Sequence, residues 1–129
     1  MPTTTEQVAL DRIGQISLRA RDIGRAVRFY RDTLGMRFLF EVPNLAFFDC
    51  GGVRLMLSIV ETPEFDHAGS VIYYKVDDMQ SSYDALRKRG VEFIDEPHLI
   101  AQLEHHDLWM AFFRDPEGNT LALMSEVAR

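Results

Sequence analysis

The stretch that decides the fold is Phe112-Phe113-Arg114-Asp115-Pro116-Glu117-Gly118-Asn119-Thr120-Leu121-Ala122-Leu123-Met124, late in the chain. Its centre has the residues of a tight turn, because Asp115 suits the first position, Pro116 presets φ, and Gly118 accepts a left-handed conformation. Apolar runs on both sides predict two antiparallel strands joined by a type I turn with a glycine bulge. A hairpin fixes strand register, so this one also decides which side chains of the last strand share an inward face.

Outward from the hairpin, the chain reads as two copies of one unit. The helix caps Asp22 and Asp78 are 56 positions apart, and the helix stops Gly35 and Gly90 are 55 apart. The same comparison matches Phe38 with Phe93 at a shift of 55, and the pair Leu55 and Leu57 with Leu121 and Leu123 at a shift of 66. Matching caps, stops and strands at a nearly fixed shift predict two tandem β-α-β-β-β modules.

Local patterns give the elements of each module. Alternation over 13–20 predicts the first strand, apolar residues at helical spacing from Ile23 to Leu34 predict a helix, and three more strands are expected. We place these strands over 36–42, 45–50 and 53–60, and the second module opens with a strand over 71–76 and an Asp78-capped helix. The predicted organisation is a single domain over 1–129, with a tail over 1–12, modules over 13–60 and 70–127, and a linker over 61–69.

Composition excludes several classes of partner. Fourteen basic residues against twenty acidic ones give a formal net charge of −6, and no run of Lys or Arg is present. A nucleic-acid or membrane partner is therefore not expected. The start of the sequence lacks the pattern of a signal peptide, and the single Cys50 cannot form an internal disulfide, so we expect a cytoplasmic location.

These features together resemble the vicinal oxygen chelate superfamily, which includes glyoxalases, bleomycin-resistance proteins and extradiol dioxygenases. The resemblance rests on the paired modules, Leu34-Gly35, Val76-Asp77-Asp78 and the 115–119 turn, and it covers residues 13 to 127. It implies an α+β fold in which two tandem βαβββ modules form a curved mixed sheet with a central cleft and the helices outside. It also implies a small-molecule ligand, a homodimer and, for the family's enzymes, a divalent metal.

The metal enzymes of this family usually carry His, Glu or Gln at four inward positions. Carried over residue by residue, these positions hold Gln15, Met56, Val71 and Ala122. A thioether is a poor ligand for hard or borderline ions, and Val and Ala have no donor atom. A catalytic metal generally needs three protein ligands, so we predict no metal ligands and no cofactor, and expect an apolar cleft with these four residues in it.

Several other side chains are candidates for the cleft. By period two, Tyr73 shares the inward face with Val71 and Lys75, and Trp109 either walls the cleft or packs in the core or an interface. His98 is the histidine expected in the pocket, where it would exchange a proton with a ligand. His105 and His106 are adjacent and point to opposite faces of an extended segment, so they are solvated histidines or part of a displaced metal site.

Two functions follow from this pattern. The preferred one is a metal-independent protein that binds or sequesters an amphipathic or aromatic molecule, similar to the bleomycin-resistance branch. The alternative is a lyase, isomerase or dioxygenase that uses a rearranged ligand set, such as Gln15 with His98 or His106, or an acid-base pair that includes Tyr73 and His98.

Overall fold

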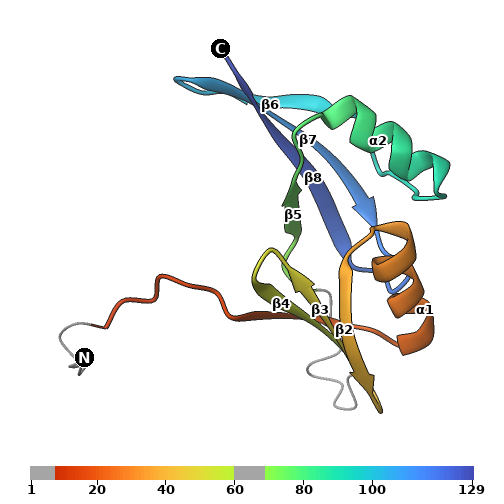
Figure 1. Cartoon of the computed structure of the whole chain (residues 1–129). Coiled ribbons are helices and arrows are strands. Elements are labelled where there is room, and N and C mark those ends of the chain that lie inside the picture. The colour runs from red at the N-terminus through yellow and green to blue at the C-terminus, as the bar shows by residue number, and fades with distance from the viewer. Residues whose placement is uncertain (1–7, 60–68) are drawn as a thin grey trace.

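A computed structural model describes residues 8–59 and 69–129 of the chain. Each module carries four strands and one helical segment (Figure 1). The first module consists of β1 (Gln15–Arg19), α1 (Ile23–Arg28), the π-helix η2 (Phe29–Thr33), β2 (Arg37–Val42), β3 (Leu45–Cys50) and β4 (Val53–Ser58). The second consists of β5 (Ile72–Lys75), α2 (Met79–Lys88), β6 (His98–Gln102), β7 (His106–Arg114) and β8 (Thr120–Ala128).

The strands form two separate mixed sheets, with the orders β1-β4-β3-β2 and β5-β8-β7-β6. The first strand of each module runs parallel to the last, and the other neighbours are antiparallel. Both units therefore have the same topology, which confirms the predicted α+β fold of two βαβββ modules. The difference from expectation is that the structure has two sheets rather than one continuous sheet.

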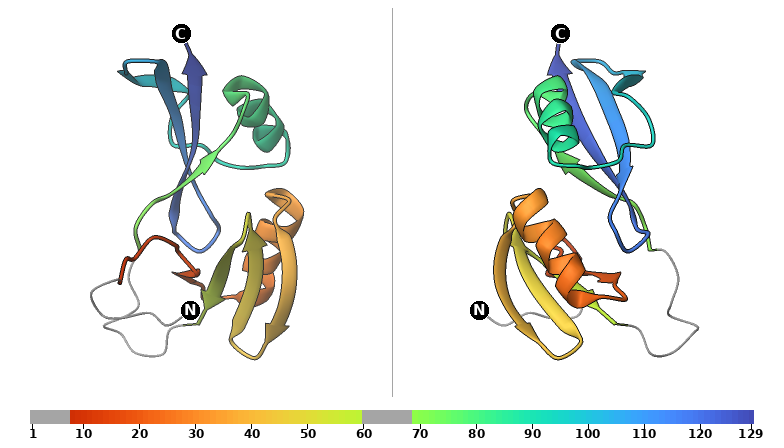
Figure 2. Two further views of the ribbon diagram at one scale, coloured as in Figure 1. Left: turned by 60° about the vertical axis from the view of Figure 1, so that its left-hand side comes forward. Right: turned by 90° about the vertical axis from the view of Figure 1, so that its right-hand side faces the viewer.

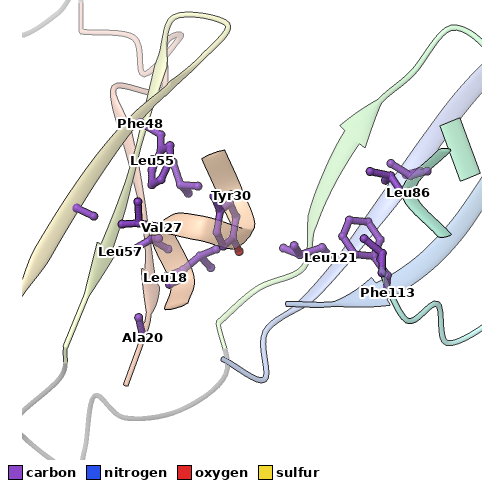
Figure 3. Packing of buried hydrophobic residues seen from close by; sticks show 14 of the residues in the cluster. Leu18, Ala20, Val27, Tyr30, Phe48, Leu55, Leu57, Leu86, Phe113 and Leu121 are labelled. Atoms are coloured by element: carbon purple, nitrogen blue, oxygen red, sulfur yellow. The ribbon is translucent and has the colours of Figure 1, made fainter. Parts of the chain in front are cut away.

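Both helices lie on the same side of the sheets (Figures 1 and 2). The buried apolar side chains lie between the helices and the sheets and form one cluster with members from both modules (Figure 3). In the first module Val27 and Tyr30 pack with residues such as Phe48 and Leu57, and in the second Leu86 packs with Phe113 and Leu121. Because both helices lie on this side, no helix of the described residues covers the opposite faces of the sheets.

The predicted helix caps are confirmed. Asp22 accepts a hydrogen bond from the backbone N–H of Arg25 at 3.0 Å, and Asp78 accepts one from Ser81 at 3.0 Å. These bonds satisfy N–H groups that have no partner within a helix. None of the described helices is both long enough and apolar enough to cross a membrane.

Two local features differ from the sequence-based expectation. The first helix ends in a π-helical turn, where the N–H of Leu34 donates to the carbonyl of Phe29 at 2.9 Å. This wider turn supplies a partner for a carbonyl at the end of the helix, which would otherwise lack one. In the second module Phe93 makes an isolated bridge to Phe113, and the paired strand begins later, at His98. The expected linker falls on residues that, apart from 69, lie outside the described ranges.

The hairpin turn has the predicted geometry. The N–H of Gly118 donates to the carbonyl of Asp115 at 3.3 Å, and Gly118 has a φ of 84°, which favours glycine. The Asp115 carboxylate also accepts the N–H groups of Glu117 at 2.9 Å and Asn119 at 2.8 Å. The turn is thus rigid through its own hydrogen bonds.

This turn also docks on the first module. The buried Glu117 carboxylate accepts hydrogen bonds from the N–H groups of Arg21 and Asp22, and the Arg25 guanidinium lies 2.6 Å from it. Asn119 donates from Nδ2 to the carbonyl of Arg19 at 3.0 Å. The sequence that marks the hairpin therefore also joins the second module to the start of α1.

Candidate functional site

The face of the sheets opposite the helices, here called the open face, carries most of the predicted site residues, though not Trp109. On this face the side chains follow the period of two, in register across neighbouring strands. In the first module the open face includes Gln15, Ser17, Phe40, Phe47, Arg54 and Met56. In the second it includes Tyr73, Lys75, His98, His106, Leu108, Met110, Phe112, Ala122, Met124 and Glu126.

Gln15, the one metal-position residue with an oxygen donor, is already engaged. Its Oε1 accepts a hydrogen bond from Nε of Arg54 at 2.8 Å, and its Nε2 lies 3.7 Å from the sulfur of Met56. The register places Gln15 directly opposite Arg54 on the parallel strand. A permanent cation therefore occupies the oxygen that a metal would need.

The same arginine covers an aromatic shelf. The Arg54 guanidinium lies 5.6 Å from the ring centroid of Phe47, and Phe47 stacks on Phe40 with 4.6 Å between centroids. Stacked rings beside a cation suit a flat ligand with an electron-rich or anionic group. Phe40 is 48% exposed, so the shelf is accessible in the single chain.

In the second module two rings close over the position where the family's enzymes often have Glu. Ala122 lies in register between Tyr73 on β5 and Phe112 on β7. The rings meet edge to face with 6.0 Å between centroids, and Ala122 is 0% exposed. The methyl side chain leaves room for this aromatic pair, whereas a carboxylate at the same place would have to separate the rings.

A charged chain lies further along the open face of the second module. One carboxylate oxygen of Glu126 is 2.7 Å from Nζ of Lys75, and the other is 2.7 Å from Nε2 of His106. The hydrogen bond from Lys75 lowers the pKa of Glu126 and raises that of Lys75. The carboxylate thus holds an ammonium group and an imidazole in fixed positions on the same surface.

A cavity lies where the unpaired edge of β1 approaches the segment before β5. Its volume is ≈ 530 Å³. Val71 and Tyr73 line it from the second module, and Ser17 lines it from the first. Two predicted site residues therefore meet the first module here.

The histidines occupy separate places. His98 lies on the edge strand β6, where its Nδ1 is 2.9 Å from the carbonyl of Glu96, and β7 and β8 separate it from Tyr73. The proposed acid-base pair of Tyr73 and His98 is therefore not brought together within one chain. His105 is largely exposed beside Glu104, and His106 contacts Glu126, so the two neighbours point apart as expected.

Of the places expected for Trp109, the structure supports packing against the core. Trp109 pairs with Leu99 and Ser125 and packs against the core on the helix side. It therefore does not wall the open face. Alternation from Phe112, which faces outward, would have placed Trp109 on the opposite face, so the signal was present in the hairpin itself.

Comparison with known proteins agrees with this architecture. A family model described as the glyoxalase/bleomycin resistance protein/dioxygenase superfamily matches residues 12–123. The chain belongs to this superfamily. It is 31% identical over 125 residues to a glyoxylase-like domain-containing protein of Didymella fabae, covering 86% of this chain and 91% of that protein.

Solved structures of the superfamily share the fold. A glyoxalase/bleomycin resistance protein/dioxygenase from Nocardioides has a TM-score of 0.75 at 22% identity, with 93% of this chain and 86% of that chain covered. Lactoylglutathione lyase from Agrobacterium tumefaciens has a TM-score of 0.71 at 22% identity, with coverage of 88% and 92%. At these identities the likeness extends to the fold alone.

The divalent metal of the superfamily's enzymes does not fit the residues of this chain. Across the described ranges, no three His, Cys, Asp or Glu side chains lie close enough together to hold a metal ion. At the four carried-over positions Gln15 is bonded to Arg54, and Ala122 lies beneath two rings. Met56 and Val71 add no hard donor.

Sequence reasoning missed the residues that make the aromatic and charged contacts of the open face with the predicted ones. They are Phe40, Phe47, Arg54, Phe112 and Glu126. Period two from Met56 reaches Arg54, and period two from Ala122 reaches Glu126, so both faces were predictable. Their partners were not, because cross-strand contacts depend on a register that a single sequence does not determine.

Proposed function

We propose that this chain is a cytoplasmic binding protein that takes up a small aromatic or amphipathic molecule on the open face without a catalytic metal. The observation that carries the proposal is the hydrogen bond from Arg54 to Gln15. It puts a guanidinium at the carried-over metal position, where it would repel a second cation and attract a ligand's acceptor group.

The chemistry of the surface supports an aromatic ligand. The Phe40 and Phe47 shelf of the first module and the Tyr73 and Phe112 pair of the second both present ring surfaces. Small-molecule sites are mostly apolar with a few placed polar groups, and Arg54 supplies one beside the shelf. The family's Glu position is apolar as well, which removes the charge that a bound metal would balance.

A second copy of the chain would complete the site. The open face leaves large apolar side chains uncovered, among them Phe40 at 48% and Tyr73 at 45% exposure. Pairing of two chains would bury such surface and turn two shallow faces into an enclosed cleft. Sedimentation should therefore give about twice the 14.9 kDa chain mass. A strictly monomeric protein at high micromolar concentration contradicts the homodimer.

The binding proposal is tested with chelator-dialysed protein and the neutral aromatic probe N-phenyl-1-naphthylamine. Val71→Asp places a carboxylate in the cavity between β1 and β5, so the proposal expects weaker binding by a protein that still folds. Arg87→Asp, on the exposed surface of α2, is the matched control. Unchanged binding and melting of Val71→Asp would contradict the proposed site.

The rival function is an enzyme, and one arrangement favours it. Glu126 holds His106 and Lys75 at 2.7 Å each on the open face, where an imidazole so oriented suits proton transfer to a bound substrate. If the chain is such an enzyme, His106→Gln will abolish turnover of a bound carbonyl compound while leaving its binding intact. If the chain is only a binding protein, it does not turn the compound over, and His106→Gln leaves binding unchanged.

A further inference from the structure

A second hollow lies on the helix side, between the two modules. It has a volume of ≈ 480 Å³ and draws its lining from both modules. Its deep wall is apolar, with the buried side chains of Leu86, Phe113 and Leu123. This volume is within the range of small-molecule sites. The strand residues of the second module that line it, Tyr74, Phe113 and Leu123, belong to the helix-facing side of β5, β7 and β8.

An unpaired hydroxyl belongs to this hollow. Tyr74 lines it, and the Tyr74 hydroxyl oxygen is buried with no hydrogen-bond partner among the described residues. Burial raises the pKa of Tyr74, as do the nearby Cys50 and Asp115, so the hydroxyl keeps its proton and can donate it to an acceptor. A buried hydroxyl without a partner is costly, and a ligand oxygen would remove that cost.

The internal repeat explains why this hydroxyl is left over. A shift of 56 matches Tyr30 with Leu86 and Leu18 with Tyr74, so at these two matched positions each module has one tyrosine and one leucine, in exchanged order. The Tyr30 hydroxyl meets Asp115 at 2.7 Å. In the second module the residue that matches Tyr30 is Leu86, which has no hydroxyl. The hydroxyl of Tyr74 starts instead from the position that matches Leu18.

The turn between β3 and β4 of the first module lacks the bridging side chain that the matching turn of the second module has. A shift of 66 matches Glu117, whose carboxylate bridges to α1, with Gly51, which has no side chain. Gly51 and Cys50 therefore line the hollow where a bridging side chain would otherwise stand. The imperfect repeat fills one junction with a carboxylate and leaves the other open.

The rim is positively charged. Arg37 and Arg89 line the hollow from different modules, and the one carboxylate among its lining residues is Asp49. Asp49 already accepts the N–H of Gly52 at 3.2 Å. Arg89 donates from Nη1 to the carbonyl of Thr33 at 3.0 Å, which ties the ends of the two helical segments together beside the hollow. Two guanidinium groups and a hydroxyl donor favour an acceptor-rich, anionic group.

We propose that this helix-side hollow is a second small-molecule site, which binds an amphipathic anion such as a carboxylate or sulfonate with an aromatic body. The aromatic body packs on the Phe113 wall, and the anionic group lies toward the Tyr74 hydroxyl and the arginines of the rim. The site is separate from the open face and does not depend on the function proposed there.

Cys50 makes this site directly testable, because it is the single cysteine of the chain and lines the hollow. The probe is 8-anilinonaphthalene-1-sulfonate, and the readout is the rate of Cys50 alkylation by iodoacetamide, followed by mass spectrometry of the full chain. Saturating probe should slow alkylation at least about fivefold. N-phenyl-1-naphthylamine, the analogue without the sulfonate, should need about a tenfold higher concentration to give the same protection.

Three variants locate the protection. Tyr74→Phe should raise the probe concentration needed for half-maximal protection about fivefold, as expected for loss of one hydrogen bond. Ala85→Trp fills the mouth from an exposed position on α2 and should abolish the protection, while Val71→Asp on the other side of the sheets should leave it unchanged. Equal alkylation rates with and without probe, or full protection in Ala85→Trp, would overturn the proposal. Loss of protection in Val71→Asp would assign the probe to the open face instead.

Discussion

The hydroxyl of Tyr30 donates a hydrogen bond of 2.7 Å to the carboxylate of Asp115, which is 85 positions further along the chain. Tyr30 is 0% exposed, and the carboxylate raises the pKa of its hydroxyl after burial itself, which is the larger cause. Figure 3 shows Tyr30 in the core of the first module, whereas Asp115 lies in the turn between β7 and β8 of the second. One buried bond therefore couples the two halves of the repeat.

Removal of this hydroxyl tests the coupling. Tyr30→Phe keeps the ring but deletes a hydrogen bond to a charged acceptor, so the free energy of unfolding should fall by about 1.5 to 3 kcal/mol. Urea denaturation measures the change. Tyr83→Phe is the control, since Tyr83 is also buried but contacts Phe93 through its ring. Equal losses for the two variants would show that the bond to Asp115 contributes nothing.

The carboxylate of Glu117 is the second coupling element. Its side chain is 0% exposed and meets Arg25 at 2.6 Å, as well as the backbone at the start of α1. Glu117→Gln replaces an acceptor oxygen by an amide group facing these donors, which should cost about 2 kcal/mol in thermal or urea unfolding. Glu92→Gln, at an exposed position, should change stability by less than about 0.5 kcal/mol. A Glu117→Gln protein as stable as the parent would show that this carboxylate does not stabilise the contact between the modules.

The ion pair between Lys75 and Glu126 predicts a defined pH dependence. Because the folded pKa of Glu126 is lowered, its contribution to stability is present above the unfolded value and is lost as pH falls through the folded one. Because the pKa of Lys75 is raised, its contribution is present below the unfolded value and is lost as pH rises through the folded one. The pair is therefore intact between the lowered pKa of Glu126 and the raised pKa of Lys75.

Carboxyl-carbon NMR titration measures this directly. Lys75→Met should raise the pKa of Glu126 toward its ordinary range, because the largest cause of the lowering is the hydrogen bond from Lys75. Lys88→Met removes an equal charge from the exposed end of α2 and is the control. A Glu126 titration that is the same in both variants would show that the 2.7 Å contact does not persist in solution.

Introduction of a family-like carboxylate tests the apolar character of the open face. Ala122→Glu must place a charge under the Tyr73 and Phe112 rings or force the rings apart. The variant should lose on the order of several kcal/mol of stability, because the carboxylate is buried without a partner. Thermal melting is the measurement, with Thr120→Glu, only partly buried on the same strand, as the comparison. An Ala122→Glu protein that melts like the parent would mean that the position is open to solvent.

The sequence predicted the fold well because local signals agreed with one another. Asp22 and Asp78 cap the helices as expected, and the strand over Leu45–Cys50 has the predicted bounds. Strand alternation also placed Tyr73 and Ala122 correctly on one face. These features depend on a residue and its immediate neighbours, so they are legible in a single chain.

The site was less predictable because its contacts join distant positions. Gln15 contacts Arg54, which is 39 positions away in the sequence, and Lys75 on β5 contacts Glu126 on the neighbouring strand β8. The docking of Glu117 on α1 has no local signal at all, since its turn is complete without that contact. Such pairs follow from tertiary register, which local patterns do not contain.

The methionine methyl groups give the most direct test of metal-free binding on the open face. Met56, Met110 and Met124 lie on the open face, whereas Met36 lines the helix-side hollow. The measurement is the carbon-13 methyl spectrum of chelator-dialysed protein during titration with N-phenyl-1-naphthylamine. Metal-free binding on the open face predicts saturable shifts of the Met56, Met110 or Met124 methyls in the absence of metal. Shifts that appear on those methyls only after a divalent metal is added, or none at all, would contradict it.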